Sequence, residues 1–442
     1  MTTQNLQTLA ERLVAYGKKH GASQIEVAID DERERNVFVF ESEVQNLTES
    51  GARGVTIRVF VDGKAASASS SDLKEATLTK LVDGAIARAR LGSADRFAGL
   101  PEREPLTVEP AELGLFDPAI SELATEKLIG RARELEAVGR GDRRINKSLG
   151  ATVATREGSR ILVNSQGFAG SFRRGGIFCN VGFQAGEGQN LFQEYWNDAS
   201  RRLADLEPVE KVAKTAVERT VRLIGARPVA TQKVPMVLEP SMTAWMLGFL
   251  AQCVSGAAIA RRQSLFVDKL GQPVGNELVS IVDDGLLKGG LGTQPFDSEG
   301  VPCRLVPVIE KGVLRSYLLD TYWGRKLELR STGNAGGPNN LHWKAGTSTP
   351  AEILKSVDKG LLLTGTIGFG LMPTTGDISV GAFGLWIENG EIVHPVAEVT
   401  ISGNLGELLK GVQMVGNDLA LRSSIDGPTI KVAEITVGGK SA

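Results

Sequence analysis

Residues 241–260 carry no charged side chain, and this stretch restricts the fold of the chain more than any other feature. A helix of 20 uncharged residues is long enough to cross a bilayer. However, polar residues such as Ser241, Thr243 and Gln252 dilute its hydrophobicity, and the surrounding sequence has the mixed pattern of a globular protein. We therefore expect a helix buried in a protein core, not a membrane span.

A chain of 442 residues exceeds the usual size of one hydrophobic core, so two domains are expected. Residues 225–233 follow a predicted helix and have the composition of a linker. We predict an amino-terminal α+β domain over residues 1–226 and a carboxy-terminal domain over residues 227–442.

The charge is nearly balanced, with 50 basic and 52 acidic side chains. A dedicated DNA-binding protein usually has a basic excess, so direct nucleic-acid binding is disfavoured. The three cysteines, at positions 179, 253 and 303, form no Cys-x-x-Cys pair, which fits a reducing compartment. The polar amino terminus lacks the apolar run of a signal peptide, so we expect a cytoplasmic protein.

Helical and strand periodicities alternate in the first half of the chain. Asp62-Gly63 separates two apolar runs and is a strong signal for a two-residue hairpin turn. The predicted helices cover residues 4–19, 72–91, 121–138 and 206–224. The predicted strands cover residues 26–29, 36–41, 55–61, 64–68, 151–155, 160–164 and 171–184, with a turn at 156–159. These elements form an α/β-layered domain.

The second half is rich in strands. Two hairpins are predicted to turn at residues 310–312 and 388–390, because each supplies a glycine where a turn needs positive φ. The other predicted strands cover residues 234–238, 278–282, 396–402 and 428–437, around a helix at 241–259 and a polar glycine-rich loop at 330–340. The predicted fold class is therefore α+β, with an antiparallel β-rich carboxy-terminal domain around a buried helix.

Short acidic-glycine motifs recur in a fixed order along the chain. They are Glu41-Ser-Glu-Val-Gln-Asn46, Gly54-Val-Thr-Ile-Arg-Val59, Asp62-Gly63, Ile281-Val-Asp-Asp-Gly285, Asp297-Ser-Glu-Gly300, Ile309-Glu-Lys-Gly-Val-Leu314, Ser331-Thr-Gly-Asn334, Ile387-Glu-Asn-Gly-Glu-Ile392 and Val415-Gly-Asn-Asp418. Their order and spacing over nearly the whole chain resemble the TldD/PmbA family, known as the modulator of DNA gyrase proteins.

This resemblance implies two kinds of subunit. A TldD-like subunit carries His-Glu-x-x-x-His on a helix, which binds a zinc-like metal and supplies a general base, with a further Cys ligand near its carboxyl terminus. A PmbA-like subunit, also called TldE, lacks these residues and pairs with the first. Here Gly248, Phe249 and Cys253 occupy the three motif positions, and no Cys follows Val415-Gly-Asn-Asp418. The chain therefore resembles the PmbA/TldE kind, and we expect no metal and no catalytic residue in it.

Other chemistry is weakly supported. His20, His342 and His394 are too scattered to form a local site, although a cluster with Asp283, Asp284 or a cysteine stays open. No motif supplies a base that would activate Cys253. The glycine-rich runs at 289–292 and 365–370 lack a phosphate-binding context and are expected to be tight turns. Thr332, Gly333 and Asn334 are the predicted substrate-binding residues, since the resemblance places this loop near the peptidase cleft.

The first hypothesis is a non-catalytic, metal-free subunit of a TldD/TldE-type metallopeptidase, inactive alone. Its partner would be the subunit with the HExxxH helix, and its substrate an unstructured peptide. The resemblance implies peptide-precursor maturation and antitoxin turnover. The alternative is a homodimeric, non-enzymatic protein that binds peptides or partner proteins. A standalone peptidase with an unrecognised site is the third hypothesis.

Overall fold

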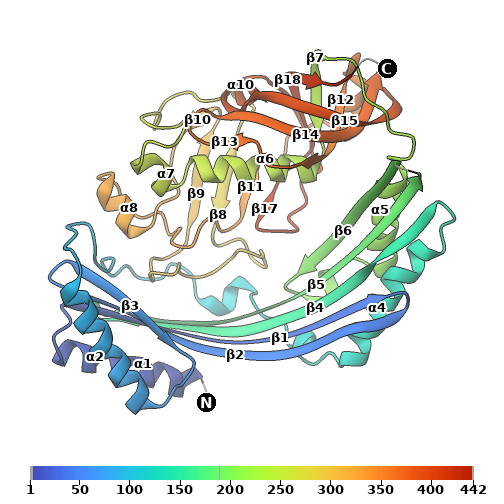
Figure 1. The fold of residues 1–442 in the computed structure, drawn as a ribbon. Helices are drawn as coiled ribbons and strands as arrows, with labels where there is room; N and C mark the ends of the chain where they lie inside the picture. Colours follow the sequence, from blue (N-terminus) through green and yellow to red (C-terminus); the bar gives the residue numbers. More distant parts are fainter. Residues whose placement is uncertain (1–2, 189, 441–442) are drawn as a thin grey trace.

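The computed structural model describes residues 3–188 and 190–440. Within these residues the strands form three sheets, and helices pack on their faces (Figure 1). The predicted α+β class is confirmed.

The first sheet is built from long antiparallel strands before residue 201, in the order β3-β2-β1-β4-β5-β6. The strands are β1 (Gln24–Phe40), β2 (Glu43–Val61), β3 (Lys64–Ser70), β4 (Ile145–Asn164), β5 (Ala169–Glu187) and β6 (Asn190–Ser200). Four of these strands, β1, β2, β4 and β5, are longer than the 3–10 residues of most strands in globular proteins. Because a twisted sheet of such long strands coils, it forms a curved surface, and the second half of the chain lies on its concave side (Figure 1).

Helices pack on the opposite side at the two ends of this sheet (Figure 1). At one end, α1 (Thr3–Lys19) and α2 (Glu75–Leu91) pack against β1 and β2 and bury Ile25, Val27 and Ile29. At the other end, α4 (Thr125–Arg140) and α5 (Val209–Val221) bury Val37 and Val39. The first sheet therefore has two separate apolar cores joined by its own strands. The remaining short elements here are η1 (Pro110–Leu113), α3 (Pro118–Ser121) and η2 (Leu203–Asp205).

The middle of the sheet corrects two predictions. The charged runs after residue 29 and at residues 156–159 were expected to interrupt strands, yet β1 and β4 continue through both. The charges are paired between strands: Glu32 on β1 forms ion pairs with Arg156 on β4 and Arg174 on β5. Charged residues resemble a turn in sequence, but here they are the half-buried centre of a ladder.

Other predicted elements are confirmed with shifted ends. The hairpin turns at Asp62-Gly63, where both φ angles are positive, at 50° and 76°. The helix predicted from residue 72 begins at Glu75, and Asp72 instead accepts hydrogen bonds from the Lys74 amide and the Thr77 hydroxyl. The helix predicted from residue 121 begins at Thr125.

The second half begins with β7 and contains two sheets. In the larger one, β12, β7, β18, β15 and β14 pair in sequence, and β14 pairs again with β12, which closes a ring. Its strands are β7 (Gln232–Leu238), β12 (Lys359–Ile367), β13 (Leu371–Met372), β14 (Asp377–Glu388), β15 (Glu391–Asn404), β16 (Val412–Val415) and β18 (Ile430–Gly438). Most pairings are antiparallel, as predicted, although β12 and β7 run parallel.

The smaller sheet has the order β10-β9-β8-β11-β17. Its strands are β8 (Ile281–Asp284), β9 (Leu305–Glu310), β10 (Val313–Leu314), β11 (Leu341–Trp343) and β17 (Ile425–Asp426). The helices of this half are α6 (Pro240–Cys253), α7 (Gly256–Ala260), α8 (Thr321–Lys326), α9 (Pro350–Lys355) and α10 (Leu405–Lys410).

The uncharged stretch forms two helices, not the single helix predicted at 241–259. Helix α6 ends at Cys253, and α7 starts after Ser255, whose hydroxyl accepts a hydrogen bond from the Ala258 amide. The break arises because the Val254 carbonyl and the Gly256 amide both bond the backbone of Leu318. No helix in the described part of the chain is long and apolar enough to span a membrane. The division into domains after residue 226 stays a prediction.

Candidate functional site

Helix α6 has one buried face and one open face. The side chains of Phe249 and Cys253 are 1% and 0% exposed and belong to the core shared by both sheets of the second half. Gly248 lies on the other face, where an added Cβ would have no described atom within 4 Å. The three positions predicted to correspond to the metal motif are thus divided: one faces open space and two face the core.

Helix α6 offers poor ligands for a metal. From Pro240 to Cys253 it carries no His, Asp or Glu, so Cys253 is its single side chain of a type that commonly ligates zinc. Burial raises the pKa of the Cys253 thiol to about 12, whereas a metal ligand must be a thiolate. Across residues 3–188 and 190–440, no three His, Cys, Asp or Glu side chains form a group that could hold a metal ion. The residues present therefore do not fit the metal that the family motif would bind.

The histidines lie apart and have structural contacts. His20 stacks on Tyr16 in α1, with ring centroids 3.8 Å apart. His342 lies on β11 and His394 on β15, and each places Nδ1 at 3.0 Å from a backbone carbonyl oxygen.

The other two thiols are also buried. Burial raises the pKa of Cys179 to about 11 and raises the pKa of Cys303 as well. None of the three cysteines has the low thiol pKa that a nucleophile needs.

The loop predicted to bind substrate is held by internal hydrogen bonds. Thr332 accepts a hydrogen bond from the Leu319 amide and donates one to Asn334 Oδ1, at 2.8 and 2.7 Å. Asn334 is 5% exposed and donates from Nδ2 to Asp283 Oδ2 at 2.6 Å. Gly333 has φ of 79°, and an added Cβ would lie 2.7 Å from the Pro302 carbonyl oxygen. These residues position the loop, and their contact with a substrate stays a prediction.

Two buried carboxylates organise the loops around this one. Asp283 accepts hydrogen bonds from Asn334 and from the amide of Asn339, and its pKa is raised by burial. Asp297 accepts from the amides of Glu299, Val301 and Ala335, and burial raises its pKa to about 7. Each carboxylate therefore links its own segment of the chain to the segment at residues 334–339.

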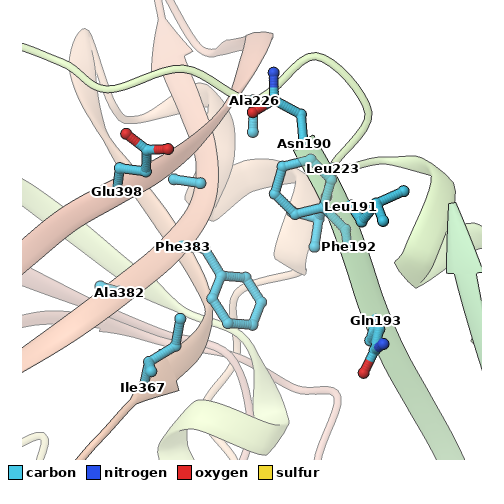
Figure 2. Close-up of a pocket in the computed structure, with 11 residues that line it drawn as sticks. Asn190, Leu191, Phe192, Gln193, Leu223, Ala226, Ile367, Ala382, Phe383 and Glu398 are labelled. Atoms are coloured by element: carbon cyan, nitrogen blue, oxygen red, sulfur yellow. The ribbon is translucent and has the colours of Figure 1, made fainter. Parts of the chain in front are cut away.

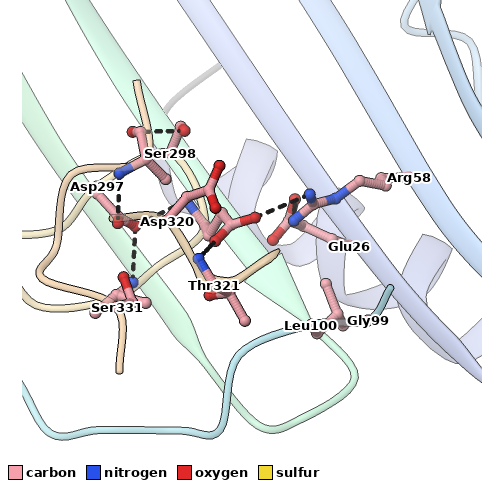
Figure 3. Close-up of polar contacts among 12 residues, drawn as sticks. Glu26, Arg58, Gly99, Leu100, Asp297, Ser298, Asp320, Thr321 and Ser331 are labelled. Atoms are coloured by element: carbon pink, nitrogen blue, oxygen red, sulfur yellow. Dashed lines mark hydrogen bonds and ion pairs between the residues drawn. The ribbon is translucent and has the colours of Figure 1, made fainter. Parts of the chain in front are cut away.

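A third polar centre, which we call the seam, joins the two halves of the chain. It consists of Glu26 on β1, Arg58 on β2, and Glu299 from the second half. The Arg58 guanidinium lies 3.1 Å from each carboxylate, and Glu299 Oε2 accepts from the Thr321 amide. Figure 3 shows Glu26 and Arg58 on the first sheet, facing the loop that carries Asp297 and the start of α8 at Thr321. Burial raises the pKa of Glu26 to about 7, and its Oε2 has no hydrogen-bond partner among the described residues.

Other contacts between the two halves also hold them together. Arg325 donates hydrogen bonds to the carbonyls of Phe97, Gly99 and Leu100. Phe296 packs edge-on against Phe168, with ring centroids 5.0 Å apart. Just before α6, Glu239 forms ion pairs with Arg219 of α5 and with Arg222, the residue that follows α5. The second half therefore contacts the first sheet at several points.

Part of the concave face of the first sheet stays accessible. Cys179, Val181 and Phe183 of β5 face the core under α4 and α5. Because side chains alternate along a strand, Phe178 and Asn180 face the opposite, concave side. Phe178 is 37% exposed, and Tyr195 of β6, which lies opposite Gly182 of β5, is 50% exposed. This combination of aromatic and amide side chains suits an uncharged polypeptide better than an anion.

Sequence reasoning missed a cavity of about 320 Å³ between the two halves. Its walls come from the start of β6, the segment that follows α5, the end of β12, and the β14–β15 pair. Figure 2 shows the Phe383 ring lying between β6 and Glu398, with Leu191 and Phe192 on the β6 side. The glycine-rich run at 365–370 supplies Ile367 to this wall, but nothing in its sequence signals a cavity. The cavity forms only when these segments, which are far apart in the sequence, come together in the fold.

Three family models match the chain. The PmbA/TldA metallopeptidase domain 1 matches residues 25–89, the central domain matches 118–224 and the C-terminal domain matches 231–439. The chain belongs to the PmbA/TldD family. The predicted resemblance is thereby confirmed.

Curated relatives of this PmbA/TldD family member match nearly its whole length. It is 33% identical to the metalloprotease PmbA of Escherichia coli O157:H7, covering 97% of this chain and 94% of the relative. It is 31% identical to the metalloprotease PmbA homolog of Haemophilus influenzae, covering 99% and 96%.

Solved structures share the fold. A Bacteroides thetaiotaomicron protein that carries the name modulator of DNA gyrase superposes with a TM-score of 0.94 at 26% identity, covering 100% of both chains. TldE from Thermococcus kodakarensis superposes with a TM-score of 0.88 at 22% identity, covering 98% of this chain and 100% of that one. The likeness to TldE shows a common fold.

Proposed function

We propose that this chain is the metal-free subunit of a TldD/TldE-type metallopeptidase. Its partner would be a TldD-like subunit whose HExxxH helix holds a zinc-like metal and supplies the general base and the attacking water. The observation that carries this proposal is helix α6, in which the motif positions are a glycine on the open face and two residues packed in the core. A member of a metallopeptidase family with such a helix depends on another chain for the metal chemistry.

The role of this chain would be to stabilise the partner and position an unstructured peptide. Three features support that role: the accessible aromatic and amide face of the first sheet, the several contacts that hold the second half on it, and the nearly balanced charge. An unfolded peptide offers backbone groups and mixed side chains, which such a surface can bind without a strong net field.

A homodimeric, non-enzymatic peptide-binding protein is the second candidate. The segment from Ile367 in β12 to Met372 in β13 exposes apolar side chains, at 65% for Ile367 and 57% for Met372, and Phe369 between the two strands is fully exposed. Exposed apolar side chains gathered at one place often mark a contact with another protein. A second copy of the chain could cover this segment as well as a TldD-like subunit could.

We also infer a cytoplasmic location. The three thiols are free and well separated, which fits a reducing compartment.

Native purification of the chain from its own cells, followed by mass spectrometry of the intact assembly, tests both candidates. A stoichiometric HExxxH-bearing partner, together with peptidase activity that needs both chains, would support the first. A complex of identical chains without that partner would support the second. Peptidase activity of the isolated chain, with about one metal per chain, would contradict both.

A further inference from the structure

The cavity between the two halves has an apolar wall and a single charge. Most of its lining is apolar: Leu191, Phe192, Leu223, Ala226, Ile367, Ala382, Phe383 and Ala397. Among the described lining residues, Glu398 alone is charged, and Asn190 and Gln193 supply amides. A cavity of about 320 Å³ at the junction of two halves has the size and position typical of small-ligand sites.

The carboxylate of Glu398 is free to bind a cation. It forms no ion pair or hydrogen bond with any other described residue. Its backbone has a φ of 55°, in the left-handed region that non-glycine residues seldom adopt. This residue lies in a bulge of β15, because the pairing with β14 shifts between Ala382 and Gly384. The bulge places an unpaired carboxylate at the edge of an apolar cavity, and strained positions of this kind are often found at binding sites.

We propose that this cavity binds the amino-terminal residue of a peptide, with the α-ammonium against Glu398 and an apolar side chain among Phe383, Ile367 and Leu223. A carboxylate beside an apolar cavity is complementary to a group that combines a cation with an apolar body. The amino-terminal residue of a peptide has both within one residue. The Asn190 amide at the same cavity can bond the following peptide group, whereas Gln193 Nε2 already donates to Gln184 Oε1 at 2.9 Å. Glu398 and Leu191 belong to different halves of the chain, so the site exists only in the assembled fold (Figure 2).

This inference extends the proposed function by naming the peptide end that the chain recognises. A binding test on the isolated chain does not depend on a TldD-like partner. Its failure is therefore distinguishable from failure to find that partner.

The test is calorimetric titration of the whole chain with three probes: the amide of Phe-Ala-Ala-Ala, its N-acetylated form and the amide of Ala-Ala-Ala-Ala. We expect the free Phe peptide to bind about fivefold more tightly than the acetylated one, as for a partly exposed ion pair. We also expect the all-Ala peptide to bind more weakly. The preference for a free amine should decrease in high salt, because exposed charges are screened.

Matched variants locate the effect. Glu398→Gln should remove the preference for the free amine, whereas Glu391→Gln, an exposed carboxylate on the same strand, should keep it. Ala226→Leu, which fills the cavity, should weaken binding of both Phe peptides.

Equal binding of free and acetylated peptides, no binding of any probe, or an unchanged preference in Glu398→Gln would each overturn the proposal. Loss of the preference in Glu391→Gln would overturn it as well.

Discussion

Helix α6 and the seam differ in whether they contain buried ionisable side chains. Helix α6 carries the three positions that we predict to correspond to the family's metal motif, and its inner face is apolar while its outer face presents a glycine. The seam, with Glu26, Arg58 and Glu299, buries three ionisable side chains where no metal motif is expected. The buried charges therefore lie in the seam, which joins the two halves of the chain, and not in helix α6.

The difference shows that a raised carboxyl pKa is not by itself a sign of catalysis. Glu26 and Asp297 have pKa values near 7, which a general base could use. However, Asp297 is saturated with backbone amides, and Glu26 is held by Arg58 in a buried interface. Their pKa values result from burial in structural contacts. The predictions below test this contrast.

The largest effect is expected from a charge on the inner face of α6. Phe249→Glu should lower the free energy of unfolding by about 5 kcal/mol, because it buries an unpaired carboxylate and removes a packed ring. Gly248→Glu, one residue away on the open face, should change stability by less than about 1 kcal/mol. Urea denaturation followed by tryptophan fluorescence measures both. Similar stabilities for the two variants would show that α6 has no buried face.

The next effect concerns the cation of the seam. Arg58→Met should cost about 4 kcal/mol at pH 8, because two buried carboxylates lose their shared partner. The matched control is Arg12→Met, which breaks the exposed ion pair with Glu75 and should cost less than about 1 kcal/mol. Equal costs would mean that the seam is no stronger than a surface ion pair.

The seam should also make stability depend on pH. The pKa of Glu26 is raised from 4.5 to about 7 in the folded chain, so the folded state binds more protons than the unfolded state between these values. This contribution is fully present below pH 4.5 and is lost as the pH rises through about 7, by about 3 kcal/mol. Glu26→Gln removes this titration. Its stability relative to the native chain should therefore rise across that window, and a flat difference in thermal unfolding from pH 5 to pH 8 would contradict the prediction.

The smallest effect is expected on the open face of α6. Gly248→Ala should stabilise the chain by about 1 kcal/mol, since alanine favours a helix and the added methyl meets no neighbour. Gly256→Ala is the matched comparison. The added Cβ would lie 2.6 Å from Trp323 Cβ, so this substitution should destabilise the folded chain. Thermal unfolding of the two variants should shift in opposite directions.

Local turn chemistry was predictable from the sequence. The hairpins at Asp62-Gly63, Lys311-Gly312 and Asn389-Gly390 all form, and all six residues have positive φ. Such turns depend on a few adjacent residues, so no distant part of the chain is needed to identify them.

Long-range pairing was not predictable in the same way. In the sequence, the charged centres of β1 and β4 resemble turns. In the structure, Glu32 forms ion pairs with Arg156 and Arg174 across the sheet. The break at residues 254–255 depends on Leu318, more than sixty positions away. The family resemblance predicted that Asn334 lies near the peptidase cleft, but only the structure shows that its side-chain amide bonds the buried Asp283. Its contact with a substrate stays a prediction.

The sequence by itself determined the α+β class, the hairpin turns, the buried uncharged segment and, through ordered motifs, membership of the PmbA/TldD family. Only the tertiary structure decided which motif position of α6 faces open space, how Arg58 joins the halves, and where the cavity beside Glu398 lies. The physical reason is that turn and helix preferences are set by neighbouring residues. Burial, ion pairing and cavities are set by residues that meet only when the chain has folded.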